Sequence, residues 1–166
     1  MATKFKIILL FFHIALTGFS QDGMYNIEFY FTHSLRIPMH YVDIKISKRW
    51  QEISINAKTR PLENYPQWAK SGTDTTFSLS QEQFQAIINS VKSISCLSIE
   101  KEISEQTNSL GLDGVTCKIN YGIQDIISYT IWSPDVETKK RGLTNFLNCC
   151  NLIIKTAGLD AKKVLE

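Results

Sequence analysis

Apolar and polar residues alternate over two consecutive runs in the second half of the chain. In the first run the apolar residues are the odd-numbered ones from Val115 to Tyr121, and the second run repeats the pattern from Ile127 to Ile131. A period of two places one side of a strand in the core and the other in water. Gly122, between the two runs, suits a turn that needs an unusual backbone conformation. The pattern therefore predicts a β-hairpin with one buried face.

The first third of the chain contains three further alternating runs. These runs are residues 25–35, 39–48 and 52–59. The parity of the apolar positions changes between the last two, because Ile44 and Ile46 are even-numbered whereas Ile53 and Ile55 are odd-numbered. The chain must therefore turn or bulge within residues 47–52. We predict a tight connection there, although neither glycine nor asparagine marks it.

Two segments have apolar residues at the three-and-four spacing of an amphipathic helix. The first begins after Ser80, which together with Gln83 has the spacing of a capping box. The second is predicted from Glu137 to about Ala157, and Gly158 ends it. The two apolar stripes consist of Phe84, Ile87, Ile88, Val91 and Ile94, and of Leu143, Phe146, Leu147, Cys150, Ile153, Ile154 and Ala157.

Two other segments lack both periodicities. Residues 60–76 read as a long loop that carries Tyr65 and Trp68, and loops of this length in compact domains are often functional. Two interpretations stay open, namely that the two aromatic residues form a binding surface or that they fold back over an edge of the sheet. Residues 97–110 read as an irregular connection.

The order of predicted elements is β-β-β-α-β-β-α. It indicates an α+β fold in which an antiparallel sheet of about five strands has two amphipathic helices packed on one face. We find no internal repeat and no linker-like stretch.

Residues 1–20 have the features of a secretory signal peptide. Two lysines precede an apolar run from Ile7 to Leu16, and the small residues Gly18 and Ser20 suit cleavage after Ser20. The apolar run is short for a membrane span. An uncleaved N-terminal anchor is the alternative.

The remaining residues 21–166 have the length of one domain with its own core. The leader contains two lysines and no acidic residue, so its removal leaves 16 basic and 16 acidic residues. Balanced, scattered charges give no electrostatic footprint for nucleic acid or for an anionic membrane. We therefore expect no nucleic-acid partner and no stable membrane insertion after cleavage.

All four cysteines, Cys96, Cys117, Cys149 and Cys150, lie in the exported part. An even number suggests disulfides in an oxidising compartment, and four thiols allow three pairings. Cys117 lies on the buried side of the hairpin and Cys150 on the helical stripe that covers the sheet, so these two can form a bridge. Cys96 and Cys149 are a possible second pair. The alternative, that Cys117 and Cys150 are merely small buried residues, stays open.

The sequence offers few residues that could take part in catalysis or bind a metal ion. Two histidines follow the leader, and His33 or His40 could act as a base only with a partner such as Ser34 or Asp43. The chain has no C-x-x-C pair and none of the short motifs of serine hydrolases, zinc proteases or phosphate-binding loops. Asp113 with Gly114 is explained by turn chemistry. We expect no metal and no cofactor.

Four short stretches carry a resemblance. They are Phe77-Ser78-Leu79-Ser80 at a helix start, Leu112-Asp113-Gly114-x-Thr116, Trp132-Ser133-Pro134 and Ala157-Gly158-Leu159. They resemble small, exported, uncharacterised bacterial proteins in which a strand pair after L-D-G-x-T is followed by S-P and an amphipathic helix. The resemblance spans about half of the chain and implies a bacterial envelope setting and the α+β arrangement, without an activity or a site.

These features predict a periplasmic or secreted protein that is not an enzyme and that binds a protein or a ligand. The architecture also resembles immunity proteins that neutralise delivered toxins, so an immunity or inhibitor role is one alternative. A small periplasmic hydrolase that uses His33 or His40 is another. If there is a binding surface, we expect Tyr65 and Trp68 to contribute to it.

Overall fold

A computed structural model of the chain describes residues 25–34, 39–62, 72–106, 114–123 and 125–165. The strands are β1 (Tyr25–His33), β2 (Tyr41–Arg49), β3 (Glu52–Arg60), β4 (Thr73–Ser78), β5 (Val115–Gly122) and β6 (Ile126–Trp132). The helices are α2 (Gln81–Lys92), α3 (Cys96–Gln106), α4 (Thr144–Thr156) and α5 (Ala161–Leu165).

The strands form one open, six-stranded sheet in the order β4-β3-β2-β1-β5-β6. Every pairing is antiparallel, and β1 lies inside the sheet between β2 and β5. The register places Phe29 of β1 opposite Ile44 of β2 and opposite Ile119 of β5. Apolar residues therefore line up across neighbouring strands on one face, as a period of two requires.

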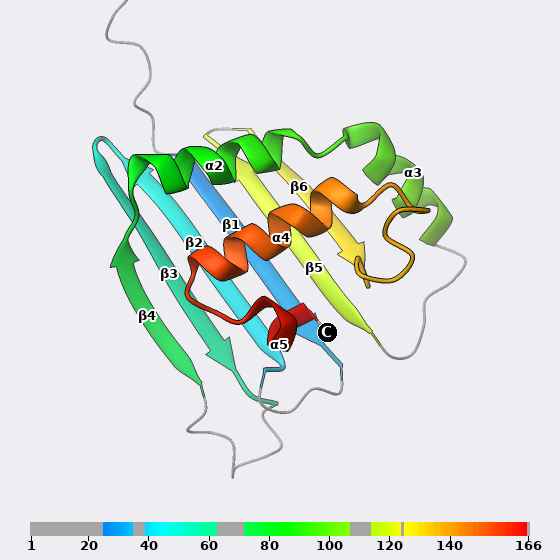
Figure 1. Ribbon diagram of the computed structural model, residues 1–166, viewed down its shortest axis with the longest axis horizontal. Coiled ribbons are helices and arrows are strands. Elements are labelled where there is room, and N and C mark those ends of the chain that lie inside the picture. Colours follow the sequence, from blue (N-terminus) through cyan, green and yellow to red (C-terminus); the bar gives the residue numbers. More distant parts are fainter. Residues whose placement is uncertain (1–24, 35–38, 63–71, 107–113, 124, 166) are drawn as a thin grey trace, which may run out of the picture.

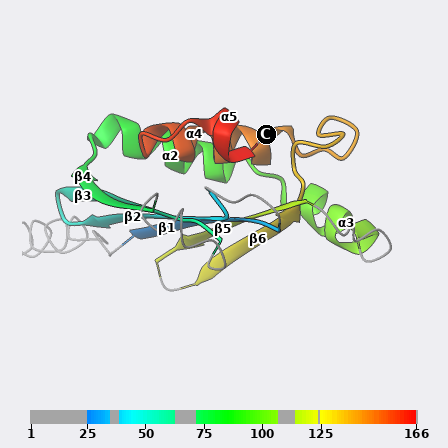
Figure 2. The ribbon, with the colours of Figure 1, turned by 90° about the horizontal axis from the view of Figure 1, so that it is seen from below.

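Two layers make up the described structure (Figure 2). Helices α2 and α4 lie next to each other on one face of the sheet, with α5 beside them (Figure 1). Helix α3 lies at the β6 edge of the sheet (Figure 1). The α+β class with helices packed on one face of an antiparallel sheet is thus confirmed.

The core lies between the sheet and these helices, where the alternating and helical patterns placed it. The inward residues of β1, β2 and β3 and the apolar stripe of α2 are buried, among them Ile27, Phe29, Phe31, Val42, Ile44, Ile46, Ile53, Ile55, Ala57, Phe84, Ile87 and Val91. The capping box is also present, because the Gln83 amide donates to Ser80 Oγ over 3.1 Å and the Ser80 amide donates to Gln83 Oε1 over 2.9 Å.

The sheet has one strand more than the five or so that were expected, since the segment predicted as a loop over residues 60–76 leads into β4. All six residues of β4 are exposed. As an edge strand with no buried face, it lacks the alternation that reveals a strand in the sequence.

The helices also differ from the prediction. Residues 97–110 were expected to be irregular, yet α3 occupies most of them, with Ile99 buried but Leu97 78% exposed. Helix α4 begins at Thr144 rather than Glu137, because residues 134–142 form turns and Gly142 has a φ of 70°. Helix α5 was not predicted, since five residues are too few for a periodic pattern.

Candidate functional site

The face of the sheet opposite α2 and α4 carries no helix among the described residues (Figure 2). We call it the open face. Alternation along the strands puts on it Glu28 and Tyr30 of β1, Tyr41, Asp43, Lys45, Ser47 and Arg49 of β2, Glu52, Ser54, Asn56 and Lys58 of β3, and Lys118 and Asn120 of β5. Most of these side chains are polar or charged, which is the expected outer face of a one-sided antiparallel sheet.

A hydrogen-bonded cluster occupies the middle of the open face. The register places Glu28 of β1 between Lys45 of β2 and Asn120 of β5. Tyr30 Oη donates to Glu28 Oε2 over 2.9 Å, and Asn120 Nδ2 donates to the same oxygen over 3.2 Å. This arrangement orders the side chains of two neighbouring strands around one carboxylate.

The cluster changes the pKa of both Glu28 and Tyr30. Partial burial opposes ionisation of Glu28, but the hydrogen bonds from Asn120 and Tyr30 and the charge of Lys45 lower its pKa below the ordinary value. Burial and the bond to Glu28 raise the pKa of Tyr30. Tyr30 is therefore a neutral donor and Glu28 an ionised acceptor around neutral pH.

Asp43 lies opposite Tyr30 on β2, and its side chain is 13% exposed. Burial raises the pKa of its carboxyl group, and the charge of Lys45 only partly offsets that effect. Lys45 Nζ lies 3.9 Å from Asp43 Oδ2, a long ion pair, and Asp43 Oδ1 is buried without a hydrogen-bond partner. Asn120 Oδ1 is also buried without a hydrogen-bond partner. Two acceptor oxygens of the cluster thus lack donors.

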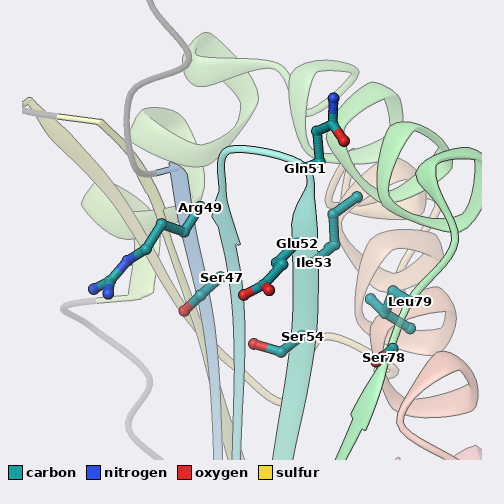
Figure 3. A pocket seen from close by; sticks show the side chains of 8 residues that line it. All are labelled: Ser47, Arg49, Gln51, Glu52, Ile53, Ser54, Ser78 and Leu79. Carbon is teal, nitrogen blue, oxygen red and sulfur yellow. The ribbon is translucent and has the colours of Figure 1, made fainter.

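A hollow of about 730 Å³ lies at the end of the open face where β2 turns into β3. We call it the hairpin hollow, and Figure 3 shows the eight residues that line it: Ser47, Arg49, Gln51, Glu52, Ile53, Ser54, Ser78 and Leu79. Ser47, Arg49, Glu52 and Ser54 point to the side of the strands away from the helices (Figure 3). Six of the eight lining residues are polar or charged, and Ile53 and Leu79 are apolar.

The turn beside the hairpin hollow consists of Trp50 and Gln51, because Arg49 and Glu52 are still paired. Trp50 has a φ of 58° and is 71% exposed. A positive φ is unusual for a bulky residue. The tight connection predicted within residues 47–52 is confirmed, and the residue that makes the sharp turn is an exposed tryptophan.

The residues predicted from the sequence as binding residues lie elsewhere in the chain. Tyr65 and Trp68 are outside the described residues, as are the leader and Asp113. Neither Trp50 nor the cluster around Glu28 was proposed as a site from the sequence. The available signals were the change of parity between Ile46 and Ile53 and the absence of a turn residue where a turn was required.

All four cysteines are free thiols in the structure. Cys117 and Cys150 are nevertheless hydrogen-bonded to each other, so the two residues expected to face one another do so. Cys96 Sγ lies 3.2 Å from Tyr129 Oη, and Cys149 is hydrogen-bonded to Ser90. Both disulfide pairings stay predictions about the oxidised protein.

The two histidines lie at facing ends of β1 and β2, where the His33 amide donates to the His40 carbonyl oxygen over 2.9 Å. His40 Nδ1 is buried and has no hydrogen-bond partner. The charges that act on Asp43 belong to Lys45, Glu28, Lys58 and Arg60, and neither histidine is among them. The hydrolase alternative therefore stays a prediction without a described catalytic contact.

Within the described ranges, no group of three or more histidine, cysteine or acidic side chains could hold a metal ion. In the same part of the chain, no helix combines the length and the apolar character needed to cross a bilayer. A scan against models of known protein families gave no match, and neither did searches among curated proteins and solved structures.

Proposed function

We propose that the chain is an exported, non-enzymatic protein of the bacterial envelope that binds a partner on the open face. The observation that carries this proposal is the asymmetry of the sheet. One face is buried by α2 and α4, whereas the other presents an ordered polar cluster and a hollow and is covered by no helix among the described residues.

The polar cluster supports binding because its hydrogen bonds are incomplete. Asp43 Oδ1 and Asn120 Oδ1 each lack a donor, although Glu28 beside them accepts two hydrogen bonds. Leaving a buried acceptor unpaired costs about 1–3 kcal/mol. A partner that opens the cluster and supplies donors would recover part of that cost.

The distribution of charges on the open face indicates which kind of partner it can bind. Glu28 lies opposite Lys45, and Lys58 forms a 2.8 Å ion pair with Asp74 of the neighbouring strand. Opposite charges in alternation produce no field of one sign, so a polyanion such as nucleic acid gains little here. An immunity or inhibitor protein is one form of this binding role.

A pull-down with matched variants tests the proposal. Ser54→Arg places a large cation in the hairpin hollow, whereas Asn148→Arg makes an equally large change on the exposed side of α4. We expect residues 21–166 to retain a partner from an envelope extract, and Ser54→Arg alone to lose it. Failure of the wild-type protein to retain anything, or equal retention by both variants, contradicts the proposal.

Export has its own test. The N-terminal residue of the protein recovered from the periplasm or the medium should be Gln21, because cleavage is expected after Ser20. Recovery of the full leader in a membrane fraction would favour the uncleaved anchor instead.

A further inference from the structure

Strand β4 forms one edge of the sheet, and within the described residues it pairs with β3 alone. All six of its residues are exposed. The strand contains neither proline nor lysine, and its pairing with β3 runs without a bulge. It thus lacks several devices by which edge strands avoid further pairing. The opposite edge differs, because helix α3 lies beside β6 (Figure 1).

The backbone groups on the outer side of β4 follow from the register. The Leu79 amide donates to the Ile53 carbonyl oxygen over 2.9 Å, directly after the end of β4. Bonded positions alternate along an antiparallel pair, so the amide and carbonyl groups of Asp74, Thr76 and Ser78 point away from β3. No described residue bonds to these outward groups. The outer side of β4 therefore presents donors and acceptors to a further strand.

The charge on β4 does not prevent such a pairing. Asp74 is its one charged residue, and Asp74 Oδ2 lies 2.8 Å from Lys58 Nζ on β3. Asn56 Nδ2, also on β3, donates to Asp74 Oδ1 and to Thr76 Oγ1 over 2.8 Å each. These side chains are thus bound to β3, and the charge of Asp74 is offset. A strand that approaches from outside meets backbone groups rather than an uncompensated charge.

We infer that β4 pairs with β4 of a second copy of the chain, an inference that goes beyond the proposed function. Bonded positions can meet only if outward residues lie opposite outward residues. This condition is fulfilled when Thr76 lies opposite Thr76 of the second copy, because Asp74 then lies opposite Ser78 of the second copy. All three outward residues are then hydrogen-bonded. A register shifted by one two-residue step leaves one of them without a partner in β4.

The side chains suit this register on both faces of the sheet. On the open face the Ser78 hydroxyl can donate to the carboxylate of Asp74 of the second copy, and no like charges lie opposite each other. On the helix side Thr75 lies opposite Phe77 of the second copy. Phe77 is 39% exposed, although its neighbour Ile55 on β3 is buried. Pairs of an aromatic and a β-branched residue stabilise antiparallel sheets, so the pairing covers apolar surface that the helices leave exposed.

The dimer changes what the open face can bind. Residues opposite each other in a sheet point to the same side, so the two open faces lie on the same side of one continuous sheet. Ser78 also lines the hairpin hollow. Asp74 of the second copy therefore brings a carboxylate to the edge of that hollow. A partner with two equivalent binding surfaces gains from engaging both open faces at once.

Sedimentation equilibrium of purified residues 21–166 tests the dimer. We expect the fraction of dimer to rise with protein concentration. Thr76→Lys places two ammonium groups opposite each other on the two-fold axis, so it should weaken association about tenfold or more. Ser128→Lys is the matched control, because Ser128 is an exposed residue of the other edge strand and lies opposite the uncharged Asn120. Its variant should associate as the wild-type protein does.

Cross-linking tests the register without adding charge. A Cys96→Ser background removes the exposed native thiol. In that background Thr76→Cys places two Cα atoms about 5.5 Å apart across the axis, within the range of a disulfide. Ser78→Cys is the control, since its two copies are offset along the strands by about 14 Å. We expect oxidation to give covalent dimers with Thr76→Cys and not with Ser78→Cys.

The outcomes separate this inference from the proposed function. A chain that stays monomeric at every concentration overturns the dimer, and so does association that Thr76→Lys leaves unchanged. Association lost only in Ser128→Lys would place the contact on β6 and overturn the inference as well. Equal cross-linking of the two cysteine variants overturns the register. Capture of an envelope partner by a monomeric chain overturns the inference while the proposed function stands.

Discussion

The thiols of Cys117 on β5 and Cys150 on α4 are hydrogen-bonded to each other inside the core. Both residues are fully buried. Burial raises the pKa of Cys150 well above its ordinary value, and the neighbouring Cys117 raises it further. The contact joins the inner hairpin strand to the helix that covers it, across 33 positions of sequence.

Burial predicts which thiols react in the reduced, folded protein. Thiol reagents attack the thiolate, and burial also raises the pKa of Cys149 to about 11. Cys96 is the exposed cysteine. We expect a colorimetric thiol reagent to modify Cys96 rapidly under native conditions and all four cysteines after unfolding. Rapid native modification of Cys117 or Cys150 would contradict the packing described here.

Oxidation should convert the same contact into a covalent link. In protein recovered from an oxidising compartment we expect peptide mapping to find Cys117 bonded to Cys150. Closing a loop of about 33 residues should stabilise the fold by roughly 3–4 kcal/mol on the chain-entropy model. Cys96→Ser is the control, since it removes a thiol outside this pair. Recovery of both Cys117 and Cys150 as alkylated free thiols would end the proposal.

Arg141 holds the segment after β6 together with α3. Its guanidinium donates to Glu102 Oε1 over 2.9 and 2.7 Å and to the carbonyl oxygens of Trp132, Ser133 and Val136. Glu102 is only 5% exposed. Arg141→Met leaves that carboxylate buried without its cation, so we expect a loss of about 3–5 kcal/mol in urea unfolding.

The neighbouring Lys140 provides a control for this loss. Lys140 forms a 3.0 Å ion pair with Glu137, but both side chains are exposed. Lys140→Met should therefore cost less than about 1 kcal/mol. Equal effects of the two methionine substitutions would show that the Arg141 contacts contribute no more than a surface ion pair.

Glu28 and Asp43 should affect the pH dependence of stability with opposite signs. The pKa of Glu28 is lowered from 4.5, so its stabilising contribution is present above that value and is lost as the pH falls through the lowered pKa. The pKa of Asp43 is raised from 3.8, so its ionised form destabilises the fold above the raised pKa, and the penalty disappears as the pH falls toward 3.8.

Glu28→Gln should therefore be less stable than the wild type at about pH 7, and Asp43→Asn should be more stable. Both differences should shrink by about pH 3, where the carboxyl groups are protonated in the folded and unfolded states alike. Urea unfolding at the two pH values measures them. Differences of the same sign would contradict the arrangement of the cluster.

The sequence predicted those strands and helices that bury a regular stripe of apolar residues. Ile44, Ile46, Ile53 and Ile55 have the alternation of half-buried strands, and the structure buries them all. Strand β4 could not be predicted in this way, because an edge strand without a covering helix buries no alternate residue. Helix α3 contacts mainly β6 and leaves Leu97 in water, so its apolar stripe is incomplete.

The candidate site was harder to predict from the sequence than the core. Alternation correctly assigned Glu28, Tyr30 and Asp43 to the polar side of their strands. Their mutual contacts depend on register and strand order, and the pairing of β1 with β5 joins residues about 90 positions apart. No local pattern encodes such a long-range pairing.

Trp50 takes a backbone conformation in the β2–β3 turn that is unfavourable for a bulky residue. Trp50→Gly and Trp50→Ala both remove the exposed indole, but only glycine adopts a φ of 58° without steric cost. We expect the glycine variant to be more stable than the alanine variant by about 1 kcal/mol in urea unfolding. Alanine as stable as glycine would show that the turn is not strained.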